Sequence, residues 1–206
     1  MALHPAAPAP ASAPTTGAAP RTAGTDAPPA PAALATPTEL GHDRARAVAA
    51  AVNPLVADAL ALYVKTKSFH WHLSGPRFRD LHLLLDEQAD QLLAAVDPLA
   101  ERVRKLGGTT LRSIGHVARL TGVADDDDAY VPAREMLLRL LDDNRRMAGA
   151  QRRAIRVCTE AGDDPTASLL QDVLDATERR IWFLFEASRE DAADPRPEPG
   201  PRPGAG

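Results

Sequence analysis

Five side chains of the types that bind transition metals recur at helical spacing between His70 and Glu101. His82 and Asp86 lie four residues apart, as do Asp97 and Glu101, and residues four apart on a helix share one face. His70 stands at the end of the preceding apolar segment. Imidazole and carboxylate groups are typical ligands of transition metals, so the spacing predicts metal ligands along one helical stripe. The alternative is a row of exposed charges in salt bridges with arginines.

The stripe is too long to surround one metal ion. Asp97 lies eleven residues beyond Asp86, which corresponds to an axial distance of about 16 Å on a helix. The stripe therefore holds either two half-built sites or half-sites that a second chain completes. Geometry favours the second, because an antiparallel two-fold copy crossing at the centre sets the pair His82 and Asp86 beside the partner's second pair. His70 can then complete the ligand set.

Four long segments with apolar residues at helical spacing predict the helices that position these groups. They cover about residues 39–72, 77–106, 132–160 and 166–188. Pro54 and Pro98 predict kinks in the first two. The connection over residues 109–128 is too long for a bare loop, and residues 113–120 could supply one short helix. The predicted fold is all-α, a four-helix bundle with a short helix in the long crossover between helices 2 and 3.

One domain is predicted between two tails. Residues 1–40 are rich in Ala and Pro and predict a disordered tail, residues 41–190 form the domain, and residues 191–206 predict a disordered Pro-rich tail. No apolar run approaches the ~20 residues of a membrane span, and the start of the chain lacks the regions of a secretory signal. Cys158 is the only cysteine, which is typical of a reducing compartment. A cytoplasmic protein is the expectation.

The motif around the metal-ligand types resembles that of the Dps family, the mini-ferritins known as DNA-binding proteins from starved cells. The likeness covers about residues 42–189. Its segments are KTKSFHW at Lys65–Trp71, FxxLHxxxD at Phe78–Asp86, DxxAERxxxLGG at Asp97–Gly108 and WFLFE at Trp182–Glu186. The distances from His70 to the four later ligand positions match the family's ferroxidase motif without a gap.

The resemblance implies a ferritin-like four-helix bundle that assembles from two-fold dimers into a hollow homo-dodecamer. It implies that His70, His82 and Asp86 of one subunit join Asp97 and Glu101 of its two-fold mate as catalytic residues and metal ligands. Family members oxidise Fe²⁺, preferably with hydrogen peroxide rather than O₂, and store the ferric mineral inside. Iron is therefore the expected metal, with zinc as a competitor, and protection from oxidative damage during starvation is the expected role. Mixed imidazole and carboxylate ligands suit iron.

Other family features fall on named residues. Trp71 matches the tryptophan beside the family's site, and simple packing is its alternative role. The family's ion-entry pores are lined by acids near the start of the last helix, which implies pore positions at Glu160, Asp163 and Asp164. Ser168 stands where relatives often have Asp, so a less negative pore is expected.

DNA binding is the weaker expectation. The net charge is -4, and the N-terminal tail holds a single cation, Arg21, whereas DNA-binding arms act through several Lys and Arg side chains. DNA-binding members of the family often carry a lysine-rich tail, and no lysine lies in a tail here. The third helix carries arginines that favour a solvated or subunit-facing stripe, with a phosphate-binding surface as the alternative: Arg145, Arg146, Arg152, Arg153 and Arg156. The alternative function is a nucleoid-associated DNA-compacting protein with an incidental metal site.

Overall fold

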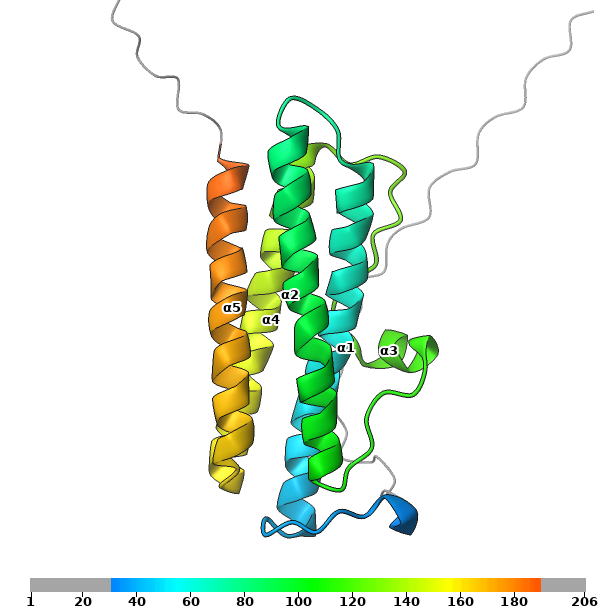
Figure 1. Cartoon of the computed structure of the whole chain (residues 1–206), viewed down its shortest axis with the longest axis vertical. Helices are drawn as coiled ribbons and strands as arrows, with labels where there is room; N and C mark the ends of the chain where they lie inside the picture. Colours follow the sequence, from blue (N-terminus) through cyan, green and yellow to red (C-terminus); the bar gives the residue numbers. More distant parts are fainter. Residues whose placement is uncertain (1–30, 190–206) are drawn as a thin grey trace, which may run out of the picture.

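In the computed structural model, four long helices run side by side along the molecule (Figure 1). The structure describes residues 31–189. The elements are η1 (Ala32–Leu34), α1 (His42–His72), α2 (Phe78–Lys105), α3 (Ile114–Leu120), α4 (Ala133–Ala161) and α5 (Asp164–Ser188). The predicted all-α bundle is confirmed, and the short helix in the crossover between the second and third long helices is α3.

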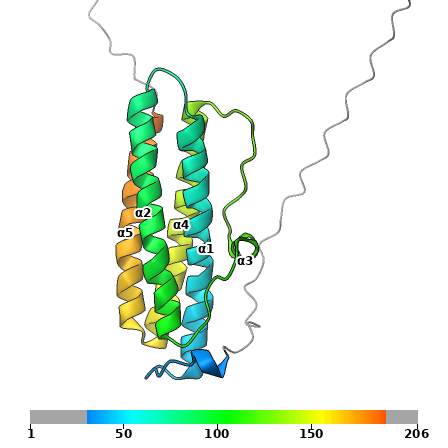
Figure 2. The ribbon, with the colours of Figure 1, turned by 45° about the vertical axis from the view of Figure 1, so that its right-hand side comes forward.

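The helix contacts leave one long face of α2 uncovered. α1 packs against α2, α3 and α4, while α5 packs against α4 and α2. Figures 1 and 2 show α3 outside the bundle, beside α1. The side chains of α2 that point away from α1 and α5 are exposed, among them Leu83, Leu93, Asp97 and Glu101. This uncovered face carries the stripe of ligand types.

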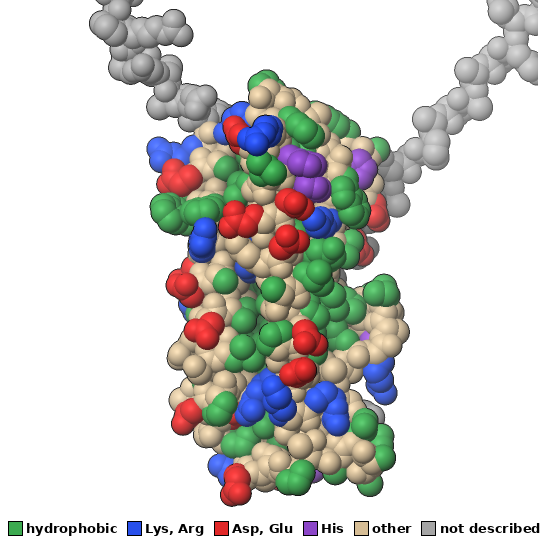
Figure 3. All heavy atoms as spheres, viewed as in Figure 1, with side chains coloured by type: hydrophobic (Ala, Val, Ile, Leu, Met, Phe, Trp, Pro, Cys, Tyr) green, Lys and Arg blue, Asp and Glu red, His purple; other side chains and the backbone are tan. Residues whose placement is uncertain are grey.

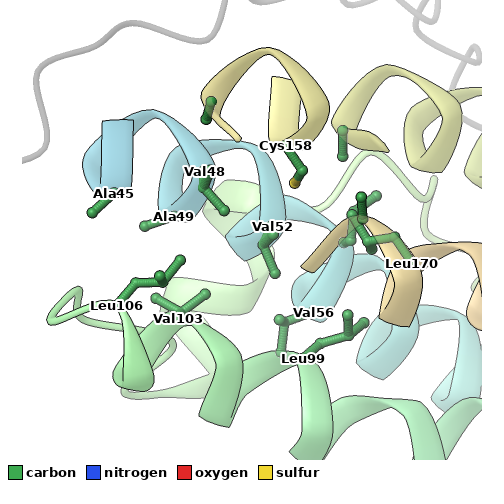
Figure 4. Packing of buried hydrophobic residues seen from close by; sticks show 14 residues of the cluster. Ala45, Val48, Ala49, Val52, Val56, Leu99, Val103, Leu106, Cys158 and Leu170 are labelled. Atoms are coloured by element: carbon green, nitrogen blue, oxygen red, sulfur yellow. The ribbon is translucent and has the colours of Figure 1, made fainter. Parts of the chain in front are cut away.

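Apolar side chains form two separate clusters along the bundle. The connection-end cluster lies next to the connection that follows α2, and Figure 4 shows it between α1, α2, α4 and α5. The turn-end cluster lies next to the turn at residues 73–77, between α1 and α2. Buried leucines dominate both, and each contributes about 1.5–3 kcal/mol to the free energy of folding. The largest fully buried leucines include Leu55 and Leu99 at the connection end and Leu62, Leu85 and Leu184 at the turn end.

The two internal prolines do not end their helices. α1 continues through Pro54 and α2 continues through Pro98. A proline removes one backbone N–H and therefore one ladder hydrogen bond. The residues that follow each proline, Leu55 and Leu99, are fully buried, and this packing holds both helices together across the missing bond.

α1 is more apolar than expected. Within residues 31–189 it is the one helix long and apolar enough to cross a membrane by length and composition, with a mean hydropathy of 1.7 over 18 residues. The expectation that no apolar run approaches the length of a membrane span is therefore wrong for α1. The physical reason is its position, because α1 contributes side chains to both hydrophobic clusters and contacts three other helices.

The described part of the chain includes the last ten residues of the predicted N-terminal tail. There Ala32–Leu34 form η1. The Thr36 hydroxyl donates to the carbonyl of Arg104 at 3.1 Å, and the Arg104 guanidinium donates to the carbonyl of Leu34 at 3.0 Å. Residues 31–40 thus contact the end of α2. The rest of that tail prediction and the prediction for residues 191–206 lie outside the described residues.

Candidate metal centre

Two histidines lie face to face beside the turn that joins α1 and α2. His70 ends α1, His82 lies near the start of α2, and their ring centroids are 3.6 Å apart. His70 Nδ1 lies 2.9 Å from the carbonyl oxygen of His82, and His82 Nδ1 lies 3.0 Å from that of His70. A carbonyl oxygen can only accept, so each Nδ1 donates, and the lone pair of the neutral ring is then on Nε2. This is the form of histidine that binds a metal, with its ring orientation fixed from behind.

The turn itself explains why the two rings meet. Gly75 adopts a φ of 111°, a conformation that side chains with a Cβ rarely take. Its carbonyl accepts the N–H of Phe78 at 3.0 Å, which begins α2. The Phe78 ring then stacks on His82 with centroids 5.0 Å apart. The short reversal thereby aligns the end of α1 with the first turns of α2.

Asp86 extends this group by one helical turn. Its Oδ1 lies 3.8 Å from His70 Nε2, and the same oxygen accepts a hydrogen bond from the ammonium of Lys67. That hydrogen bond is the main cause that lowers the pKa of the Asp86 carboxyl and raises the pKa of the Lys67 ammonium. Asp86 is therefore ionised and is held on the side of the histidines.

Asp97 and Glu101 lie further along the same uncovered face of α2. Both are exposed. Glu101 pairs with Lys105 at 3.1 Å, whereas the side chain of Asp97 makes no hydrogen bond or ion pair to any residue in the described range. Figure 3 shows acidic side chains in two groups on this face, one below the histidines and one lower down, with hydrophobic side chains between them.

The predicted ligands are thus gathered into two groups and not into one site. No three His, Cys, Asp or Glu side chains within residues 31–189 are placed to hold a metal ion together. The end with His70, His82 and Asp86 offers two Nε2 lone pairs and a carboxylate, and the other end offers Asp97 and Glu101. Each end supplies ligand atoms of the right chemistry but an incomplete set.

The side chain of Trp71 points away from its own chain. It is 66% exposed, so packing inside the bundle does not account for it. Leu93 lies between the two ligand groups on α2 and is 44% exposed. Together they make the surroundings of the ligand face partly apolar, as is common where a second protein surface packs.

The three predicted pore residues differ in their surroundings. Glu160 and Asp164 are exposed at the end of α4 and the start of α5. Asp163 is 1% exposed and pairs with the Arg102 guanidinium at 2.6 Å. It also caps α5 by accepting the N–H of Thr166 at 3.2 Å. The Asp163 carboxylate is therefore occupied within the chain and does not line a surface opening in this structure.

Sequence reasoning missed the contact between Lys67 and Asp86. The two residues lie on different helices, nineteen positions apart, and only the turn at Gly75 brings them together. One signal was available, since Lys67 stands three residues before His70 and so lies on the same face of α1.

The chain is similar in sequence and in fold to known helical-bundle proteins. The protein-family profile described as Ferritin-like domain matches residues 49–190. The DNA protection during starvation protein of Agrobacterium fabrum is 32% identical over 149 residues, which is 72% of this chain and 92% of the relative. The solved structure of DpsC from Streptomyces coelicolor has a TM-score of 0.73 at 34% identity and covers 75% of this chain and 91% of that one.

A third comparison bears on the class of protein. Dps from Vibrio cholerae O1 is described as a member of a broad superfamily of ferritin-like diiron-carboxylate proteins; it has a TM-score of 0.69 at 25% identity, covering 75% of this chain and 98% of that one. The bundle and its histidine and carboxylate groups define a ferritin-like protein. Within that class, the chain belongs to the Dps family.

Proposed function

We propose that this protein oxidises Fe²⁺ with hydrogen peroxide at sites shared between two-fold-related subunits and stores the ferric product inside a dodecameric shell. The observation that carries the proposal is the pair of incomplete ligand groups on one uncovered face of α2. Because an isologous interface brings unlike ends of the same surface together, two copies crossing antiparallel complete both sites at once. Iron is the substrate of these sites.

The residues divide the work in a way that their chemistry supports. His70 and His82 bind the ferrous ion through Nε2, and Asp86 supplies an anionic oxygen. Asp97 and Glu101 of the second subunit add carboxylates, which stabilise the ferric product more than the ferrous substrate. This difference favours loss of an electron. Sharing the ligands makes activity depend on assembly.

The proposed reaction balances with peroxide as the oxidant. Two ferrous ions each lose one electron, the O–O bond of one hydrogen peroxide molecule breaks, and two protons convert the products to two water molecules. The reaction consumes Fe²⁺ and peroxide together, which are the two reactants that generate hydroxyl radicals. Protection of the cell and its DNA under oxidative stress and starvation then follows from chemistry.

The setting of the protein is part of the proposal. Exposed Glu160 and Asp164 would attract Fe²⁺ to a pore, and zinc, which takes the same nitrogen and oxygen ligands, would compete at the site. Cys158 is a free, buried thiol. We place the protein in the cytoplasm, where ferrous iron and thiols are kept reduced.

The decisive experiment is the double substitution His82→Ala with Asp86→Asn. Peroxide-dependent oxidation of Fe²⁺ by the assembled protein should fall at least about 10-fold, toward the rate in buffer, since two ligands are lost from every site. The matched control is Asp90→Asn, which removes a carboxylate from the same exposed helix face and should leave the rate unchanged. Particle size should be measured in parallel. A variant that assembles normally and keeps the parental rate would remove the site assignment.

The second candidate function is DNA compaction, and α4 supplies the observation for it. Arg145, Arg153 and Arg156 are exposed and form no ion pair with the described residues. Phosphate binding by such a surface weakens steeply with salt. A gel-shift at low salt and at ~150 mM salt discriminates, since retention of DNA at the higher salt would favour this function.

A further inference from the structure

The interior of the bundle contains an arginine without an acidic partner. Arg180 of α5 is 3% exposed. Its Nε donates to Asn144 Oδ1 at 2.9 Å, and its Nη2 donates to Thr177 Oγ1 at 2.8 Å. These bonds engage two of its N–H groups, and no carboxylate in residues 31–189 binds the others. Burial lowers the pKa of the guanidinium to about 10, so the group is still positively charged at neutral pH.

The acids nearest to Arg180 along the elements are committed to other cations. Asp143, which precedes Asn144, pairs with Lys65 at 2.7 Å. Glu178 of α5 pairs with Arg152. Each of these carboxylates is therefore satisfied elsewhere. A buried charge without a counter-ion is costly, because the interior cannot replace the hydration that the charge loses.

Uncharged polar side chains surround this arginine in a layer. Gln151 is fully buried, and its Nε2 donates to Thr177 Oγ1 at 3.0 Å. The Thr177 hydroxyl donates in turn to the carbonyl of Val173 at 2.9 Å. The amide of Gln151 is thereby fixed, and its Oε1 is left buried with no hydrogen-bond partner. Arg180, Asn144, Thr177 and Gln151 form what we call the polar layer.

Gln88 of α2 belongs to the same level of the bundle. Its neighbour Glu87 pairs with Arg179, the neighbour of Arg180, at 3.5 Å across the contact between α2 and α5. Gln88 and Arg180 are both buried, so they follow this pair into the interior. The Nε2 of Gln88 has no hydrogen-bond partner. A buried, unused amide donor thus lies near the level of Arg180 on the facing helix, and Arg180 has N–H groups beyond those that bind Asn144 and Thr177.

We propose that the polar layer binds one small monovalent anion of about the size of chloride, which neutralises Arg180. A water molecule could accept the free hydrogen bonds but could not balance the charge. A single negative charge matches the single guanidinium, and close packing on both sides excludes a bulky ion. The anion is expected to lie near the Nε2 donor of Gln88 and away from the lone acceptor Oε1 of Gln151, which would repel it. This site is separate from the ligand face of α2.

The test compares the thermal unfolding midpoint of the full-length assembled protein in chloride and in gluconate, at equal ionic strength and neutral pH. Gluconate is too large for the layer. Chloride should raise the midpoint in a saturable manner, by about 5 °C when it reaches about 100 times its dissociation constant. Arg179→Met, which removes the exposed neighbouring charge, should show the same rise. Arg180→Met should show none.

A second measurement keeps the proposal testable if Arg180→Met does not fold. Crystals of the unaltered protein soaked in bromide should give an anomalous peak within hydrogen-bonding distance of the Arg180 guanidinium. Equal midpoints in the two salts, an equal chloride effect in Arg180→Met, or bromide peaks confined to the surface would each overturn the proposal.

Discussion

Lys67 holds the oxygen of Asp86 that the proposed function gives to a metal ion. In this structure the ammonium of Lys67 holds Oδ1, and His70 Nε2 lies 3.8 Å from the same oxygen. The Lys67 side chain therefore fills a place that a cation would take. Under the proposed function, metal binding would require the ammonium to move and leave the carboxylate to the incoming charge.

Removing this competitor should strengthen metal binding. The substitution Lys67→Met keeps the length of the side chain but removes its charge. We therefore expect the dissociation constant for the metal ion to fall about 10-fold, equivalent to about 1.4 kcal/mol of binding free energy. Calorimetric titration with Zn²⁺ as a redox-inert probe measures it. The control is Arg156→Met, which removes an exposed cation on α4 and should have no effect. Unchanged or weaker affinity in Lys67→Met would show that the ammonium helps to build the site.

Asp58 illustrates a carboxylate whose burial works against its charge. It is 8% exposed, and its Oδ1 accepts the Thr121 hydroxyl at 2.9 Å and the Gly122 N–H at 2.7 Å. Burial, as the largest cause, raises the pKa of Asp58 above 3.8. The folded protein therefore holds this proton more tightly than the unfolded chain does. Stability is lost as pH rises from 3.8 through the raised pKa.

The substitution Asp58→Asn should remove that loss while the amide oxygen still accepts both hydrogen bonds. At pH 7 the variant should be more stable than the parent, by up to about 1 kcal/mol. The gain should shrink as the pH falls toward 3.8, because Asp58 itself then becomes protonated. Thermal unfolding at pH 7 and pH 4.5 measures both values, with exposed Asp127→Asn as the control. A loss of stability at pH 7 would contradict this account.

Among the elements, the N-terminus of α5 is held by a network of side-chain hydrogen bonds. Asp163 accepts the N–H of Thr166, accepts the Thr166 hydroxyl and binds Arg102, whose Nε also donates to Thr166 Oγ1 at 2.6 Å. The cap thus joins the start of α5 to the second half of α2. It fixes Arg102, the residue that follows Glu101 in the chain.

Loss of this cap should be costly. Asp163→Ala removes the capping oxygen and leaves Arg102 without its partner, so we expect a destabilisation of roughly 3 kcal/mol. The neighbouring change Asp164→Ala affects only an exposed charge in the first turn and should cost less than about 1 kcal/mol. Urea denaturation of the two variants side by side gives the difference. Similar costs for both would mean that the buried network contributes little.

These elements also show which features of the structure can be predicted from the sequence and which cannot. The period of the apolar residues predicts four helices and a crossover helix because that signal is local and repeated, and the spacing of His82 and Asp86 predicts their common face for the same reason. The burial of Asp163 could not be predicted, since its partner Arg102 is sixty-one residues away. Neither could the hydrogen bonds that His70 and His82 exchange with each other's backbone, because these depend on the geometry of one turn. The polar layer exists only once α4 and α5 have packed together, because its residues come from both helices.

At the scale of the whole molecule, the proposed sharing of each site between two chains can be tested with mixed dimers. Each two-fold dimer would hold two sites, and each site would take His70, His82 and Asp86 from one chain and Asp97 and Glu101 from the other. A chain altered at the first set and a chain altered at the second set are then inactive alone. A mixed dimer of the two has one doubly damaged site and one intact site.

Coexpression of His82→Ala/Asp86→Asn with Asp97→Asn/Glu101→Gln should therefore restore activity. Random pairing makes about half of the dimers mixed, with one intact site in two, so about one quarter of the parental rate of Fe²⁺ oxidation is expected. Each variant expressed alone should stay near the rate in buffer. If both ligand sets served one chain, the coexpressed mixture would stay equally inactive.

The polar layer separates the two hydrophobic clusters on one side of the bundle, between α4 and α5. The connection-end and turn-end clusters meet along α1, where Val56 belongs to the first and Ala59 to the second, but between α4 and α5 they are separated by Thr177 and Gln151. Cooperative opening follows contiguous apolar contact, so we expect this boundary to favour two units that open separately. Amide hydrogen exchange should report distinct protection levels for Ala154–Leu170 and for the half that carries His70 and His82. Local fluctuation at one end would then leave the ligand geometry at the other end undisturbed.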